Sequence, residues 1–325
     1  MIGMSGGKDG EERNMRIGVQ TKNVVYDSCP EKGFRMLKEA GFSCADFSLN
    51  SYLTNASLYR FETNDFFSAG RQELERFFAP HKAAAEAAGI YINQMHMPYP
   101  NYVPRGSREL NDYLRNVVAP RSMEVCAFFG CPCIVIHGFK LAYFLGSEEA
   151  EWQVTEEFLD FLAPMAREMG ITMCVENLYE SIGGHIVEGP CCNPGKAAER
   201  IDRMNDRHHG EVLGFCFDTG HGNLTGLDFE HFISILGHRL KVLHIHDNDG
   251  EADLHQIPFT FTRTRENLAS TDWDGFVRGL RKVKFDGVLS FETAPVLTAF
   301  PETMKQDVLA FLAKIGNRFS ESAGG

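Results

Sequence analysis

Short apolar runs recur along the chain, and each is followed by a longer segment in which apolar residues return every three or four positions. Runs of four to eight residues rich in Val, Ile and Phe are typical of strands, whereas the longer period is typical of helices. The pattern predicts strands at residues 15–21, 42–49, 90–96, 133–137, 171–176, 212–218, 240–246 and 287–292. It predicts helices at 30–41, 71–88, 107–129, 148–169, from 194, and at 228–236, 273–283 and 302–315, and a loop at 178–193.

Strands that alternate with helices indicate a parallel sheet, and eight such units in about 300 residues favour a closed (β/α)8 TIM barrel. A doubly wound sheet would gather functional residues at one switch point, but here polar residues end six of the eight predicted strands. We therefore expect an α/β protein with one TIM-barrel catalytic domain at residues 15–318. Residues 1–14 are predicted to be a disordered leader and 319–325 a flexible tail.

Composition narrows the class of protein. Of 325 residues, 43% are apolar, which is enough for a sizeable core, and no run approaches the roughly 18 apolar residues of a membrane span. The net charge of −12 disfavours nucleic acid as the partner. Nine cysteines scattered through apolar runs predict reduced thiols and a cytoplasmic location. An aromatic loop at 52–67 is expected to form either a lid or the contact of a homo-oligomer.

Metal-binding side chains end six of the predicted strands. The carboxyl ends of barrel strands converge on one mouth, so these residues are expected to become neighbours. Each alone is commonly a helix cap or a salt-bridge partner, but six in one layer favour a shared cation. Three carboxylates and one imidazole on the last four strands suit Mn²⁺ or Zn²⁺, and also Mg²⁺ or Co²⁺. The six residues are His96, His137, Glu176, Asp218, His244 and Glu292.

A second polar set follows these strands. The candidates to bind substrate or a second metal ion are His96, His137, His221, Asp253 and His255. For the last three, which lie on loops, a loop-stabilising hydrogen bond is the alternative. His246 shares a strand face with His244 and is expected to line the pocket or support a ligand. Candidates for a substrate phosphate, or simply solvated charges, are Lys140, Arg263 and Arg265. The histidines in or beside helices are predicted to be solvated: His81, His208, His209, His231 and His238.

Seven short motifs together resemble the xylose isomerase-like TIM-barrel superfamily, which holds sugar phosphate isomerases and epimerases, inosose dehydratases and endonuclease IV. They are HMPY at 96–99, IHG at 136–138, VEN at 175–177, FDTGH at 217–221, LHIHDND at 243–249, DLH at 253–255 and FET at 291–293. The resemblance to the epimerase branch implies that Glu176, Asp218, His244 and Glu292 bind the metal. It also implies that Glu176 and Glu292 are the catalytic acid and base, and that His221 binds substrate.

The same resemblance leaves other activities open. All nine metal-ligand positions of endonuclease IV have a matching residue type here, which implies a trinuclear zinc phosphodiesterase as the alternative. Metal-dependent dehydratases, lyases and a non-catalytic sugar-binding barrel are further alternatives. The epimerase resemblance favours a sugar or sugar phosphate isomerase/epimerase that removes a proton next to a carbonyl through a metal-stabilised enediolate.

Overall fold

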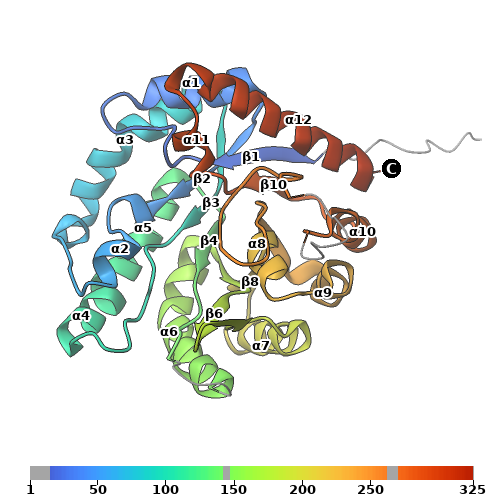
Figure 1. Cartoon of the computed structure of the whole chain (residues 1–325). Helices are drawn as coiled ribbons and strands as arrows, with labels where there is room; N and C mark the ends of the chain where they lie inside the picture. The colour runs from blue at the N-terminus through green and yellow to red at the C-terminus, as the bar shows by residue number, and fades with distance from the viewer. Residues whose placement is uncertain (1–14, 142–146, 262–269, 325) are drawn as a thin grey trace, which may run out of the picture.

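The structure is a computed structural model that describes residues 15–141, 147–261 and 270–324. Eight parallel strands form a barrel surrounded by helices, so the predicted (β/α)8 fold is confirmed (Figure 1). The predicted leader at 1–14 lies outside the described residues. The strands are β1 Arg16–Gln20, β2 Cys44–Ser48, β3 Tyr91–His96, β4 Cys133–Ile136, β5 Thr172–Glu176, β8 Leu213–Asp218, β9 Leu240–His244 and β10 Val288–Phe291.

The strand order is β10-β1-β2-β3-β4-β5-β8-β9, and the first and last strands of this series meet to close the ring. The closing bonds lie just beyond β9: the Ile245 N–H donates to the Ser290 carbonyl at 2.9 Å, and the Glu292 N–H donates to the Ile245 carbonyl at 3.1 Å. Because side chains alternate along a strand, residues two apart share the barrel interior. Cys174 thus lies below Glu176, and Cys216 below Asp218.

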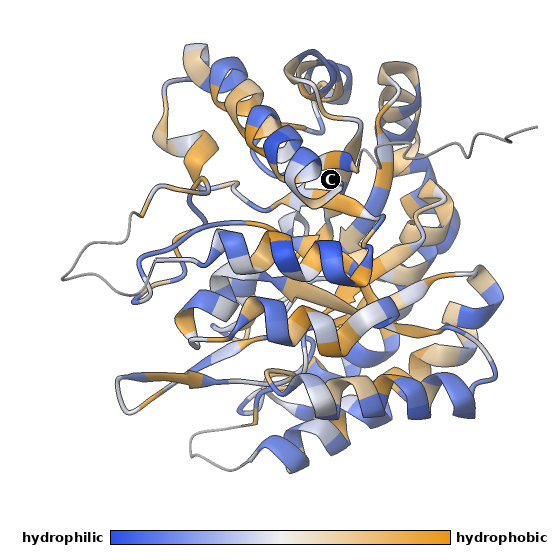
Figure 2. Ribbon diagram, turned by 90° about the vertical axis from the view of Figure 1, so that its right-hand side faces the viewer, coloured by the Kyte–Doolittle hydropathy of each residue, from blue (hydrophilic) through white to orange (hydrophobic). Residues whose placement is uncertain are grey.

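The outer helices pack one apolar face on the barrel. Figure 2 shows hydrophilic and hydrophobic residues alternating along them, the pattern expected for helices with one buried face. Helices α3 and α6 end at Gly89 and Gly170, whose positive φ angles of 65° and 67° suit glycine. The longer helices are α1 Pro30–Ala40, α3 Arg71–Ala88, α5 Ala119–Phe129, α6 Glu148–Met169, α7 Pro194–Arg207, α9 Phe229–Leu236, α10 Trp273–Val283 and α12 Lys305–Gly324. Four shorter helices are α2 Asn55–Leu58, α4 Arg108–Tyr113, α8 Thr219–Leu224 and α11 Val296–Ala299.

Two sequence predictions about local structure are wrong. The predicted loop at 178–193 contains a hairpin, β6 Tyr179–Ile182 with β7 His185–Glu188, turned by two glycines of positive φ. The predicted tail also fails, because α12 continues through Gly324. Phe319 is buried there and its ring stacks on Trp273 at 5.4 Å, so apolar packing extends the helix.

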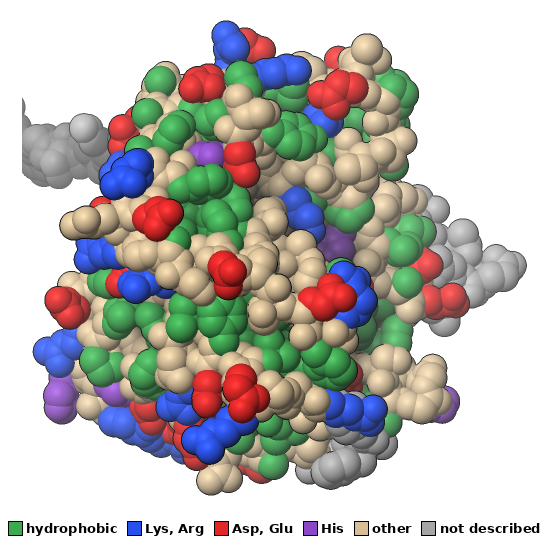
Figure 3. Space-filling view, turned by 90° about the vertical axis from the view of Figure 1, so that its left-hand side faces the viewer, with side chains coloured by type: hydrophobic (Ala, Val, Ile, Leu, Met, Phe, Trp, Pro, Cys, Tyr) green, Lys and Arg blue, Asp and Glu red, His purple; other side chains and the backbone are tan. Residues whose placement is uncertain are grey.

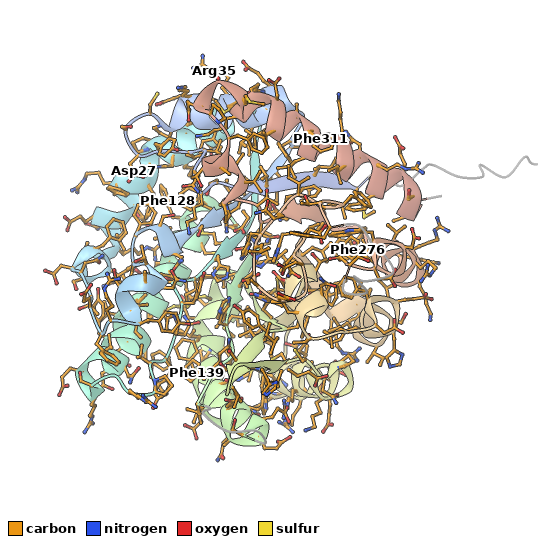
Figure 4. All side chains as sticks on the ribbon, in the orientation of Figure 1. Asp27, Arg35, Phe128, Phe139, Phe276 and Phe311 are labelled. Carbon is orange, nitrogen blue, oxygen red and sulfur yellow. The ribbon has the colours of Figure 1, made fainter. Side chains whose placement is uncertain are left out.

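Charged side chains of both signs are interspersed on the face shown in Figure 3, with apolar patches between them. Phe311 and Arg35, labelled in Figure 4, lie on the outward surfaces of α12 and α1. No helix in the described ranges is both long and apolar enough to span a membrane. All nine cysteines are free thiols, as the sequence predicts.

Candidate functional site

A cavity of about 480 Å³ opens at the carboxyl ends of the strands. Its floor is formed by residues at the ends of β3, β5 and β10, and its walls come from the segments that follow β2, β3, β4, β5, β8 and β9. Five residues of the floor and lower wall matter most below: His96, His137, Glu176, Asp253 and Glu292. The cavity therefore lies where barrel enzymes hold their active sites.

Four strand-end residues converge on one point, and two of them, Glu176 and Glu292, line the cavity. The Nδ1 atom of His244 lies 3.3 Å from Glu176 Oε1, 3.2 Å from Glu292 Oε2 and 3.9 Å from Asp218 Oδ2. Glu176, Asp218 and His244 are almost fully buried. This group, called the strand-end quartet below, places three carboxylates around one imidazole nitrogen.

His96 and His137 extend the quartet on one side. Their Nε2 atoms lie 3.1 Å apart, and His137 Nε2 lies 3.1 Å from Glu176 Oε2. His96 donates from Nδ1 to the Met97 carbonyl at 2.7 Å, which leaves Nε2 as the nitrogen with a free lone pair. Glu176 can therefore bridge the quartet and this histidine pair.

His221, Asp253 and His255 form a second group, called the loop cluster below. Asp253 Oδ2 lies 3.4 Å from His221 Nε2 and 3.1 Å from His255 Nε2. The Nδ1 atoms of both histidines donate to backbone carbonyls, of Asn177 at 3.0 Å and of Glu292 at 2.8 Å. Both Nε2 atoms thus face Asp253, and Asp253 and His255 have ligand atoms within 4.8 Å of those of His246, so these three could share a cation.

His246 connects the two groups. Its Nε2 lies 3.0 Å from Asp218 Oδ2, and its ring stacks on the His255 ring with centroids 4.0 Å apart. A Cβ atom on Gly220 would lie 1.9 Å from the His246 ring, so only glycine fits there. His246 therefore holds the carboxylate of Asp218, a member of the quartet, in place through this contact.

Burial and charge perturb most titratable groups of the site. Burial opposes ionisation of Glu292, but His244 and His255 lower its pKa to about 2. Burial would lower the pKa of His255, yet the hydrogen bond and charge of Asp253 raise it to about 9. Burial lowers the pKa of His137 to about 4. The contacts between Glu292, His244, His255 and Asp253 thus offset part of the cost of burying their charges, whereas burial dominates at His137.

The donor set fits a divalent cation. Glu176 Oε2 and Asp253 Oδ1 are buried and accept no hydrogen bond from the described residues. A buried carboxylate oxygen without a donor is costly, and a cation would satisfy it. Several groups of three residues have ligand atoms within 4.8 Å of one another, among them Asp218, His244 and Glu292. Carboxylate and imidazole donors in this number suit Mn²⁺ or Zn²⁺.

Some supporting residues were not predicted from the sequence. Gln20 donates from Nε2 to Glu292 Oε1 at 2.9 Å. Asn177 accepts from the Asp218 N–H and donates to the Asp218 carbonyl, both at 2.8 Å. Asp46 is fully buried within β2 and burial raises its pKa to about 6. Gln20 ends a strand and Asn177 follows Glu176 directly, so the rule that found the quartet could have found both.

The structure describes one of the three residues predicted to bind a substrate phosphate, and it shows that one of the histidines predicted to be solvated is buried. Lys140 lines the cavity, but its Nζ donates to the Tyr179 carbonyl at 2.5 Å and lies 4.0 Å from Glu180. Arg263 and Arg265 lie outside the described residues. His81, predicted to be solvated, is buried under aromatic rings and contacts Asp27 at 2.9 Å; Asp27 is labelled in Figure 4.

Comparisons with known proteins agree with this architecture. Residues 34–315 match the family model described as xylose isomerase-like TIM barrel. An uncharacterized protein of Sinorhizobium fredii, y4fM, is 31% identical over 278 residues, which cover 82% of each chain.

Solved structures share the fold at low sequence identity. A D-psicose 3-epimerase crystallised in the presence of D-fructose has a TM-score of 0.65 and 13% identity, covering 96% of this chain and 100% of that one. The 3-keto-D-glucoside 4-epimerase YcjR of E. coli has a TM-score of 0.64 and 17% identity, covering 92% and 99%. Together with the family match, these comparisons show that the chain belongs to the xylose isomerase-like TIM-barrel family.

Proposed function

We propose that this protein is a metal-dependent isomerase or epimerase of a sugar or sugar phosphate. The observation that carries the proposal is that Glu176 and Glu292 both reach His244 Nδ1, from β5 and from the end of β10. Two carboxylates from strands that are not neighbours in the ring thus meet at one point, and in this proposal both act on one substrate carbon. The fold shared with sugar epimerases supports the same reaction class.

The residues that would hold the metal are Glu176, Asp218, His244 and Glu292. A divalent cation bound there would act as a Lewis acid on the substrate carbonyl and make the neighbouring C–H proton more acidic. One glutamate then removes that proton and the other returns one from the opposite face, which inverts the carbon. If a single glutamate moves the proton between neighbouring carbons, the reaction is an aldose–ketose isomerisation.

The remaining site residues orient substrate or hold a further ion in this proposal. Gln20 fixes one oxygen of Glu292 through its 2.9 Å hydrogen bond, so the other oxygen is directed toward the reacting carbon. His96, His137 and His221 present Nε2 atoms to substrate hydroxyls. Asp253 and His255 contact the far end of the sugar or a second ion. Lys140 remains the described candidate to meet a substrate phosphate.

Solvent exchange tests the proposal. The metal-loaded protein is incubated in D₂O with a panel of ketoses and ketose phosphates, and deuterium at a sugar carbon is measured by NMR. Glu176→Gln and Glu292→Gln should each slow exchange by roughly 10² to 10⁴-fold, because each removes a proton-transfer group. Glu188→Gln, at an exposed glutamate of β7, is the matched control. Full activity in either site variant would refute the two-carboxylate mechanism.

A second candidate, a trinuclear zinc phosphodiesterase, is favoured by one observation. The histidine pair, the strand-end quartet and the loop cluster are three neighbouring groups, each able to hold one ion, with Glu176 shared between two of them. Cleavage of an abasic-site duplex by protein with three zinc ions per chain would replace the isomerase proposal. Loss of water from a sugar in the same panel would indicate the dehydratase or lyase alternative.

A further inference from the structure

Asp46 is a buried carboxylate without a hydrogen bond. Neither of its oxygens has a donor among the described residues, and the residue is fully buried. It lies in the middle of β2, where most barrel residues are apolar or small. Burying a carboxylate without hydrogen bonds costs folding free energy, unless its charge stabilises a nearby group.

The nearest such group is the quartet histidine. Asp46 Oδ2 lies 3.6 Å from His244 Nε2, which also has no hydrogen-bond partner in the described part of the chain. Strands β2 and β9 are separated by β1 and β10, so the contact crosses the barrel interior. The two amides beside Asp46 are directed elsewhere, Gln20 to Glu292 and Gln94 to the Leu243 carbonyl.

The two nitrogens of His244 therefore face different surroundings. Nδ1 faces the carboxylates of Glu176 and Glu292, and Nε2 faces Asp46. The ring of His96 stacks on His244 with centroids 5.5 Å apart and fixes its plane. A carboxylate at Nε2 keeps the proton on that nitrogen and leaves the Nδ1 lone pair free for a cation.

We propose that Asp46 is a positioning residue that holds His244 in the tautomer and orientation of a metal ligand. The inference rests on the metal site of the proposed function. At 3.6 Å the contact is longer than a hydrogen bond, and the positioning role requires it to shorten when the imidazole turns toward a bound cation. Asp46 itself touches neither cation nor substrate.

Metal affinity and the stability of the metal-free protein together test this role. In Asp46→Asn a neutral amide replaces the carboxylate that holds the proton on Nε2, so the preference for a free lone pair on Nδ1 is lost. Zn²⁺ and Mn²⁺ affinity, measured by competition with a chelator, should fall about 10- to 100-fold. The thermal midpoint of the metal-free variant should stay the same or rise, because a buried charge without hydrogen bonds has been removed.

The control is Asp247→Asn, at a buried carboxylate that accepts from the Thr271 hydroxyl at 2.6 Å. This variant should lose stability without metal and keep nearly the wild-type affinity. If Asp46→Asn does not fold, Asp46→Ala is measured in the same way and should also bind metal more weakly. A metal-free Asp46 variant of lower stability but unchanged affinity would overturn the positioning role.

The zinc-loaded proteins give a spectroscopic readout of the same contact. The Nε2 proton of His244 should appear as a downfield, slowly exchanging NMR signal that moves upfield in the Asp46 variants. Wild-type protein that binds no divalent metal would instead defeat the proposed function. Tight wild-type binding that the Asp46 variants share would defeat only this inference.

Discussion

The strand-end quartet and the loop cluster use the same side-chain types but differ in how the fold holds them. Quartet residues end β5, β8 and β9 or follow β10, and backbone ladder bonds on both sides fix their positions. Asp253 and His255 lie on the loop after β9, and about a fifth of each side chain is exposed. The difference indicates a preorganised centre beside a more adaptable one.

The largest difference between the two groups is expected in metal affinity, when one carboxylate is removed from each group in turn. Asp218→Asn is expected to weaken binding of the first divalent ion by more than about 100-fold, since even residues behind a ligand contribute 10- to 100-fold. Asp253→Asn should leave the first ion in place and remove a second ion or weaken sugar binding. Isothermal titration with Mn²⁺ and Zn²⁺ measures both. Equal losses of the first ion would mean that the two groups act as one site.

The next largest effect is expected in how the free energy of unfolding of the metal-free protein depends on pH. The pKa of His255 is raised to about 9 from an ordinary value near 6.5. Its contribution to stability is therefore fully present below pH 6.5 and is lost as the pH rises through 9. This loss is expected to be at most about 3 kcal/mol, measured by urea unfolding between pH 6 and about 9.5. His255→Gln should flatten the curve; an unchanged slope would assign the effect to the quartet.

The smallest effect is expected at the cavity wall. Lys140 shares its charge with Glu180 and donates to the Tyr179 carbonyl, so it mainly fixes the start of the β6–β7 hairpin. Lys140→Met should lower kcat/KM a few-fold, and by a similar factor for a neutral sugar and its phosphate. A loss confined to the phosphorylated sugar would instead make Lys140 the phosphate ligand.

The local pattern of apolar and polar residues was sufficient to predict most of the fold and the position of the quartet residues at the strand ends. Each quartet residue directly follows an apolar strand, so the rule that barrel strands end at one mouth brought them together before any coordinates. The hairpin at 179–188 was missed because its strands are short and half-exposed, without the apolar run that marks a buried strand. The tail was missed because Phe319 is a single aromatic residue whose partners lie on α10.

Asp46 and His81 show the limit of that pattern. Asp46 lies within a strand rather than at its end, and its partner His244 is about 200 residues away along the chain and across the barrel, a separation over which local periodicity carries no information. His81 has the spacing of an ordinary helical residue, yet Phe47, Phe77 and Phe78 cover it. Phe77 and Phe78 lie on the same helix as His81, but Phe47 comes from β2, and the burial of His81 is complete only when α3 packs against that strand.

The sequence by itself determined the alternation of strands and helices, and with it the barrel and the set of side chains at its mouth. This follows because hydrophobic periodicity is local and the closed barrel then fixes which strand ends meet. Only the tertiary structure decided which nitrogen of each histidine faces the carboxylates. It also decided that Gln20, Asn177 and Asp46 contact the quartet, and that His246 lies between the quartet and the loop cluster. Those features depend on contacts across the barrel interior, and their geometry is set by packing and hydrogen bonding rather than by spacing along the chain.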